Sequence, residues 1–170
     1  MVWVPQVSKM RSSLEDALTS VDKTYAELVA IANDIVNPCL KEIDKIMKEA
    51  YDNIHELSND DIRHMIIALS LKSYAFSSIK EKSSLKAECA EALRKEAYAI
   101  EYNKAEGAVA ARDNNATIEI SNEILTECVY NLVADMLKTK LDECHRVVDS
   151  LKTVLMSRMA EAKLANNLDE

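Results

Sequence analysis

The stretch LEDALTSVDKTYAELVAIANDIVNPCLKEIDKIMKEAYDNIHEL, from Leu14 to Leu57, decides the fold. Apolar residues recur along it at alternating steps of four and three, which is the spacing of helices that pack lengthwise on other helices. The stretch therefore predicts two long helical segments, each with one apolar seam. The first seam is Leu14, Leu18, Val21, Tyr25, Leu28, Ala32 and Ile35, and the second is Val36, Leu40, Ile43, Met47, Ala50, Ile54 and Leu57.

The two seams are offset by one residue, because Ile35 ends the first and Val36 begins the second. Pro38 lies beside this offset, and a proline inside a helix removes one hydrogen bond and clashes with the preceding turn. Asn37 can cap a new helix that has Pro38 in its first position. We therefore predict that residues 12–57 form a kinked N-terminal helical segment, with a kink or short break near Asn37-Pro38.

The first residues lack this pattern. Residues 1–11 show no clear period and are interpreted as an N-terminal arm, in which Trp3 either anchors to a partner or packs back on the core. Ser12 or Ser13 can cap the orphan amides of a helix. The first helix is therefore expected to begin there.

Beyond the first segment, Ser58 and Asp61 have the spacing of a capping box, in which each side chain bonds the other residue's backbone amide. This pair predicts the start of a new helix. Residues 58–165 are predicted to form a helical hairpin, and the polar residues 166–170 a frayed tail. Asp113-Asn114-Asn115 is the best candidate for the turn of the hairpin, although a continuous helix is also compatible with the pattern.

A third helical region is expected from about Ser121 to Ala165. It carries another seam in steps of four and three, which runs from Tyr130 to Leu155. A few long helices bury little surface per residue, so we expect a homo-oligomer. The residues expected to form the contact between copies are Leu137, Leu141, Val148, Leu151 and Leu155.

Composition favours the same fold class. The 170 residues include one glycine and two prolines, far below the roughly 7% and 5% of ordinary domains. Tight turns depend on glycine, so few turns and long elements are expected. Hydrophobic residues make up 48% of the chain and aromatic residues 5%, which suits helix stripes better than a β-sandwich. We predict one all-α domain of long helices with heptad packing.

The sequence shows no pattern of catalysis. One glycine cannot build a phosphate-binding loop, and the four cysteines and three histidines have no metal-binding spacing. We interpret the cysteines as reduced core residues, which favours a cytoplasmic location. We expect no enzyme activity, no catalytic or metal-binding residues and no cofactor. The chain shows neither a signal peptide nor an apolar run of about 20 residues, so no membrane association is expected.

The net charge of −8 argues against a protein that simply coats nucleic acid, although a local basic strip is still compatible with it. In such a strip, cations would hold phosphates, while Tyr98 and Tyr102, four residues apart on one helix face, would stack on bases. Interleaved acidic residues such as Glu88 and Glu96 favour the alternative of an ordinary mixed surface with core tyrosines. The candidate residues for binding single-stranded DNA are Lys82, Lys86, Arg94, Lys95, Tyr98, Tyr102, Lys104 and Arg112.

Several features of the second half point to a family. A helix rich in serine, lysine and tyrosine precedes Ile79-Lys80, and a later helix ends in Glu101-Tyr102. The segment YNKAEG, Tyr102 to Gly107, is followed by a long amphipathic C-terminal helix with a central cysteine. With these features, residues 62–162 resemble the UvsY-type recombination mediators of T-even-like phages, which share a Tyr-x-Lys-small-Glu pattern.

The resemblance implies a helical protein that forms a ring-like oligomer, partly through its C-terminal helix. Such a protein would help to load a RecA-like recombinase onto single-stranded DNA coated by an ssDNA-binding protein, in the cytoplasm of the host cell. The chain departs from the family at Ala97 and Ala99, where the family has a basic pair, so Arg94 and Lys95 would have to replace it. Residues 1–60 have no counterpart in the family.

Two other functions fit a chain of this kind. In a virion structural or assembly protein, the heptad seams would pack into a shell, neck or scaffold. In an acidic inhibitor of a host nucleic-acid-binding protein, carboxylates would imitate phosphates. The carboxylates in question are those of Asp60, Asp61, Glu81, Glu88, Glu91 and Glu101.

Overall fold

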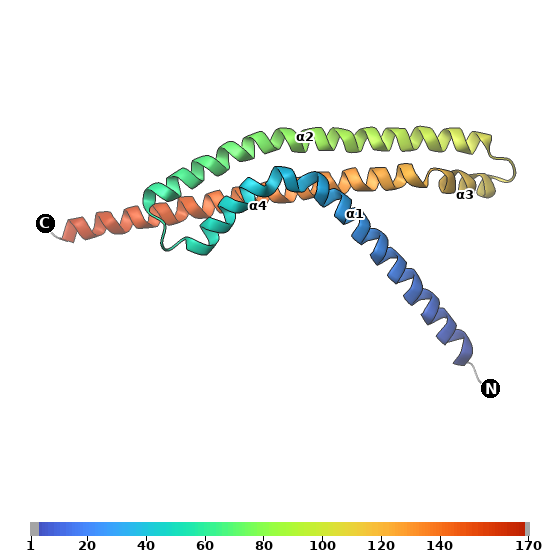
Figure 1. Ribbon diagram of the computed structural model, residues 1–170, viewed down its shortest axis with the longest axis horizontal. Helices are drawn as coiled ribbons and strands as arrows, with labels where there is room; N and C mark the ends of the chain where they lie inside the picture. The colour runs from blue at the N-terminus through green and yellow to red at the C-terminus, as the bar shows by residue number, and fades with distance from the viewer. Residues whose placement is uncertain (1–3, 169–170) are drawn as a thin grey trace.

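The computed structural model describes the backbone of residues 4–168 and the side chains of residues 18–165. This part of the chain forms α1 (Val4–Asn53), α2 (Asn59–Lys104), α3 (Val109–Glu119) and α4 (Ser121–Leu168), and it contains no strand. The all-α prediction is confirmed. Figure 1 shows α2 and α4 as a long antiparallel hairpin with α3 at its tip, and the second half of α1 lying along the hairpin parallel to α4.

The core lies where the second half of α1 meets α2 and α4. The side chains of Ile62 and Leu69 from α2 and of Leu137 and Leu151 from α4 are fully buried there, beside Val36 of α1. Of the five residues expected between copies, Leu137, Val148 and Leu151 are buried, and Leu141 and Leu155 pack against them. In this fold Leu137, Val148 and Leu151 fill the interior of one chain, so they are not available for a contact between copies, whereas Leu141 and Leu155 are only partly buried.

Helix α1 is unbroken over 50 residues and contains Pro38. A break near Asn37 is therefore excluded, while Figure 1 shows the helix changing direction where it reaches the hairpin. The helix also begins at Val4, not near Ser12, so most of the expected arm is helical. Trp3 lies outside the described residues.

The capping box at the start of α2 is confirmed. The Ser58 backbone amide donates to Asp61 Oδ2 at 3.0 Å, and the Asp61 amide donates to Ser58 Oγ at 3.1 Å. Hydrogen bonds from the Ser58 hydroxyl and amide lower the pKa of the Asp61 carboxyl, because they favour its charged form. These two residues therefore satisfy amides that the helix itself leaves unpaired.

The predicted turn at Asp113-Asn114-Asn115 is wrong, because these residues lie inside α3. The chain reverses between Lys104 and Val109 instead, where Gly107 has a φ of 107°. Only glycine takes such a φ readily, so the single glycine marks the reversal. The expected helix start near Ser121 is confirmed, and α4 continues to Leu168, well into the expected frayed tail.

Polar contacts hold the second half of α1 in place. Lys140 of α4 lies 3.1 Å from Asp44 of α1 and 2.7 Å from Glu143. Burial disfavours the charged amine, but hydrogen bonds to Glu143 and Asp44 outweigh it and raise the pKa of Lys140. On the other side, Lys72 of α2 forms an ion pair with Glu42 of α1. These pairs fix the register of α1 on both helices of the hairpin.

The cysteines are free thiols, and only Cys144 fits the expectation of a core residue. Its Sγ lies 3.0 Å from Ser73 Oγ in the interior. The expectation is wrong for the other three, which are exposed: Cys39, Cys89 and Cys128. Among the described helices, none has the length and apolarity that a membrane span requires.

Candidate assembly interface

The expected nucleic-acid strip does not form a row of free cations. Three of its basic side chains form ion pairs with carboxylates, which cancels most of their charge at short range. The hydrogen bond from Lys95 lowers the pKa of Glu91, in keeping with such a pair. Lys82 and Lys86 are exposed on α2. The three pairs are Arg94 with Glu127, Lys95 with Glu91, and Lys104 with Glu101.

The tyrosines and the remaining arginine of the strip join α3 to the end of α2. Tyr98 and Tyr102 stack with ring centroids 5.9 Å apart, as their spacing predicted. Arg112 of α3 lies 4.4 Å from the Tyr102 ring centroid and donates to the Tyr102 carbonyl at 2.9 and 3.2 Å. The Tyr98 hydroxyl donates to Asp113, and this bond raises the pKa of Tyr98. These side chains hold the tip of the hairpin together, which leaves little ring surface for a base.

The first seam of α1 is the most conspicuous apolar surface outside the core. Leu18, Val21 and Tyr25 are 56%, 63% and 61% exposed, and Ile35 is 43% exposed. We call Leu18, Val21, Tyr25 and Leu28 the arm seam. Figure 1 shows that this part of α1 leaves the hairpin and projects away from it. Leu18, Val21 and Tyr25 therefore have no partner helix within the described part of the chain, whereas Leu28 is half-buried and Ala32 of the same seam lies in the core.

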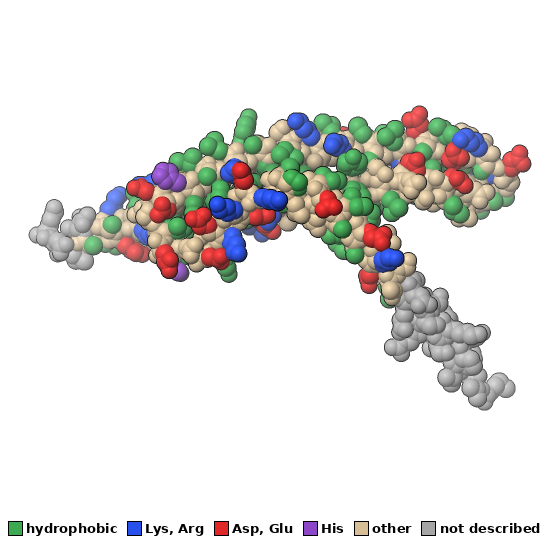
Figure 2. Space-filling view, viewed as in Figure 1, with side chains coloured by type: hydrophobic (Ala, Val, Ile, Leu, Met, Phe, Trp, Pro, Cys, Tyr) green, Lys and Arg blue, Asp and Glu red, His purple; other side chains and the backbone are tan. Residues whose placement is uncertain are grey.

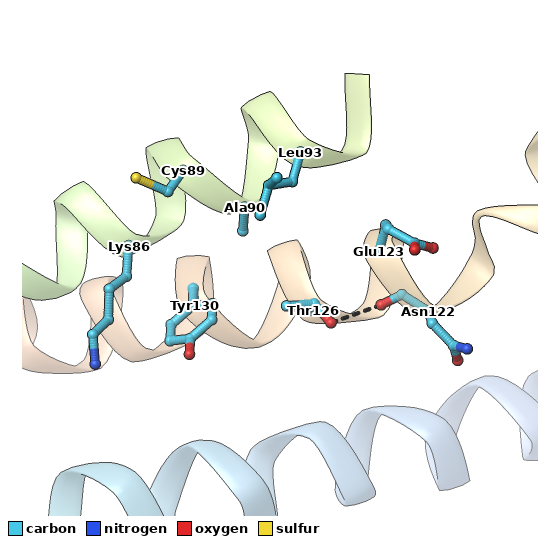
Figure 3. A pocket seen from close by; sticks show the side chains of 8 residues that line it. All are labelled: Lys86, Cys89, Ala90, Leu93, Asn122, Glu123, Thr126 and Tyr130. Carbon is cyan, nitrogen blue, oxygen red and sulfur yellow. Dashed lines mark hydrogen bonds between the residues drawn. The ribbon is translucent and has the colours of Figure 1, made fainter. Parts of the chain in front are cut away.

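A second exposed feature is a furrow between α2 and the start of α4, shown in Figure 3. It has a volume of about 430 Å³, and apolar atoms form most of its surface. Ala90 forms its buried floor, and Lys86 Nζ lies 5.8 Å from the Tyr130 ring centroid at one end. We call this the distal furrow. Its lining residues are Lys86, Cys89, Ala90, Leu93, Asn122, Glu123, Thr126 and Tyr130.

The distal furrow continues the groove of the hairpin in which the second half of α1 lies. Lys72 and Lys140 hold α1 from opposite sides through their ion pairs with Glu42 and Asp44. Two heptads further along α2 from Lys72 lies Lys86, and two heptads back along α4 from Lys140 lies Thr126. Both residues line the furrow. The furrow is therefore the next stretch of the same groove, at the point where α1 has already turned away.

The outer face of α2 carries a further row of exposed apolar side chains, which Figure 2 shows along the upper edge of the molecule. These residues point away from α4, and their spacing again follows helical turns. Sequence reasoning assigned neither this row nor the distal furrow, because a heptad pattern does not tell which apolar positions find a partner. The row consists of Ile67, Leu71, Tyr74 and Leu85.

Within the described part of the chain, no cluster of three or more histidine, cysteine or acidic residues could hold a metal ion. Comparison of the chain with protein-family models, curated protein sequences and solved structures found no match. The resemblance to UvsY-type mediators therefore stays a prediction. The geometry defines a class of surface, an unpartnered amphipathic helix beside an open furrow, and this surface is the candidate site.

Proposed function

We propose that this protein is a non-enzymatic helical assembly unit whose projecting α1 joins copies of the chain into an oligomer. The observation that carries the proposal is the exposed arm seam. Apolar side chains at heptad spacing pack on another helix when one is present, and the described part of the chain provides none for Leu18, Val21 and Tyr25. Polar residues on the opposite side of this helix, such as Asp34 and Lys23, keep that side in water.

The exposed seam represents a substantial driving force. Full burial of a leucine- or valine-sized side chain stabilises a complex by about 1.5 to 3 kcal/mol. Leu18, Val21 and Tyr25 each have more than half of their surface left to bury. Two copies that bury such seams would offset the entropy lost on association, which is a cost of several kcal/mol. The arm seam is therefore strong enough to sustain self-association.

Size-exclusion chromatography with light scattering tests the proposal. The wild-type chain, whose protomer mass is 19.0 kDa, should elute at a multiple of that mass. The double variant Val21→Asp/Tyr25→Asp places two charges in the seam and should elute as a monomer. Ala26→Asp/Ala30→Asp is the matched control, because it adds the same charge to exposed positions of the same helix outside the seam. A monomeric wild type, or equal behaviour of the two variants, would refute the proposal.

The recombination role is a finer proposal built on the same assembly. Exposed Lys82 and Lys86 on several protomers would bind one DNA strand by avidity, so that weak sites add along it. The resemblance of residues 62–162 supports a RecA-like recombinase as the second partner. Ion pairing of Arg94, Lys95 and Lys104 weighs against strong binding by each protomer.

Fluorescence anisotropy with a short single-stranded oligonucleotide tests this role. Binding should weaken steeply as salt rises, and Lys82→Ala/Lys86→Ala should weaken it at every sequence tested. Absence of binding at low salt would exclude the DNA role while leaving the assembly proposal intact. A virion structural protein would share the assembly but would instead be found stoichiometrically in purified particles.

A further inference from the structure

We propose that the distal furrow of one copy receives the arm seam of a second copy, so that two chains exchange their α1 helices. This inference rests on the proposed assembly function and specifies where the arm binds. The occupant is residues 18–28 of the second copy, and the seat is the apolar furrow between α2 and α4. The arrangement is a helix-in-groove contact made twice, once in each direction.

The furrow suits a helix because a helix already occupies its continuation. The second half of α1 fills the same groove beside Lys72 and Lys140, and the lining residues begin two heptads further on. The furrow extends over about two helical turns, from Lys86 to Leu93 on α2. Val21 to Leu28 of the arm seam also spans about two turns. Length and apolar character therefore match.

The chain's own arm does not fit this seat. Within the core, α1 presents Val36 and Leu40 to the hairpin. If α1 ran straight on in that register, the positions one and two heptads before Val36 would be Val29 and Asp22, and those before Leu40 would be Asn33 and Ala26. Asp22 and Asn33 are polar, and burying them without partners is unfavourable. Pro38 inside the helix also bends α1 away from the furrow.

An arm from a second copy escapes this restriction. It is not tied to the register of the core, so it can rotate about its own axis and turn the arm seam toward the furrow. The one-residue offset between Ile35 and Val36, which corresponds to about 100° around a helix, is the rotation that the chain's own arm would need. Residues 18–28 carry two carboxylates, Asp22 and Glu27, and one lysine, while the furrow is lined by one cation, Lys86, and one carboxylate, Glu123. Both surfaces therefore offer charges of both signs at the rim of the contact, where ion pairs between copies can form.

A pair of matched variants on α2 separates the furrow from the other exposed apolar surface. Leu93 lines the furrow and Leu85 lies on the outer face of α2, with exposures of 62% and 59%. Both side chains are exposed, so both arginine variants should fold. We expect Leu93→Arg to produce monomers and Leu85→Arg to leave the oligomer intact in light scattering. The opposite result would place the arm on the outer face and overturn the inference.

Mixing variants tests the exchange itself. Val21→Asp/Tyr25→Asp has a damaged arm and an intact furrow, and Leu93→Arg has the reverse. Each should be monomeric alone, and a one-to-one mixture should regain a dimer through one intact arm in one intact furrow. Arm-to-arm pairing predicts instead that Leu93→Arg, whose arm is intact, is already a dimer alone, and that Val21→Asp/Tyr25→Asp does not join it. Failure to recover a dimer would therefore overturn the inference.

The exposed thiol of Cys89 reports occupancy directly, because Cys89 lines the furrow and Cys128 does not. At a total protein concentration about ten times the dissociation constant of the dimer, about a fifth of the chains are monomeric, so alkylation of Cys89 should be slowed about fivefold relative to Cys128. Val21→Asp/Tyr25→Asp should remove this protection. An oligomer with a fully reactive Cys89 would refute the furrow but keep the assembly function. Protection in a monomer at every dilution would show that the chain's own arm is bound, and would overturn the exchange.

Discussion

Replacing Arg158 by alanine should loosen the junction between α1 and α2, although Arg158 is a surface-proximal residue of α4. Its two terminal nitrogens donate to the carbonyls of Leu57 and Ile54, at 2.6 and 2.8 Å. These carbonyls lie just after the end of α1 (Val4–Asn53), where backbone acceptors have no partner within the helix. A cation at that position also interacts favourably with the helix dipole. One side chain thus ties together segments about 100 residues apart in sequence.

A hydrogen bond from a charged donor contributes about 1.5 to 3 kcal/mol. The two bonds share one guanidinium, and water can replace part of the lost contact, so we expect Arg158→Ala to cost about 2 to 3 kcal/mol. For a chain of this length that corresponds to a fall of about 4 to 12 °C in the melting temperature. Arg158→Lys should cost about half as much, because an ammonium cannot reach both carbonyls in the fork geometry.

Urea denaturation followed by circular dichroism measures these free energies. Arg146→Ala is the control, since Arg146 is an exposed arginine on the same helix. It should change the free energy of unfolding by less than about 0.5 kcal/mol. If Arg158→Ala also falls below that value, water satisfies the two carbonyls as well as the guanidinium does. The contact would then contribute nothing to the seating of α1.

Three further predictions concern the bundle. Leu69→Ala should reduce the free energy of unfolding by about 2 to 5 kcal/mol in urea denaturation, because Leu69 is fully buried, whereas Leu71→Ala on the outer face should change it by less than about 0.5 kcal/mol. The lowered pKa of Asp61 means that its contribution is present above the unfolded value of 3.8 and is lost as pH falls through the folded pKa. Asp61→Asn should therefore flatten the acid side of the stability profile, and an unchanged slope would contradict the capping role. In thiol labelling followed by mass spectrometry, Cys144 should react only on unfolding, while Cys39 and Cys128 react in the native protein.

Much of the fold could be predicted from local rules. The scarcity of glycine predicted long helices, and the Ser58/Asp61 pair predicted the start of α2. The turn of the hairpin was misplaced because Asp113 and its neighbours have high turn propensity. A tertiary contact supports the helix instead, because the Asp113 carboxylate on α3 accepts a hydrogen bond from the Tyr98 hydroxyl on α2. Turn propensity decides the conformation of such segments only where no tertiary contact overrides it.

The candidate site was harder to predict, because a heptad pattern tells that a face is apolar but not what covers it. The C-terminal seam was assigned to contacts between copies, yet Leu137 and Leu151 are buried within one chain. The basic residues of the strip could be recognised in the sequence, but their neutralising partners could not. Arg94 of α2 forms an ion pair with Glu127 of α4 only because the two helices run antiparallel. The distal furrow has no sequence signature at all, since it exists where α1 leaves the hairpin.

The one-residue offset beside Pro38 has a consequence for the whole molecule. Without the offset, Leu28 and Tyr25 would lie on the same face of α1 as Val36. The hairpin of the same chain would then bury them. The offset rotates the arm seam out of that register, and the bend carries it away from the hairpin. Removing the bend alone, as in Pro38→Ala, leaves the offset in place. It should therefore leave the arm seam exposed in the protomer and the oligomer intact. That result would show that the offset, and not the proline, keeps the arm seam off the hairpin of its own chain.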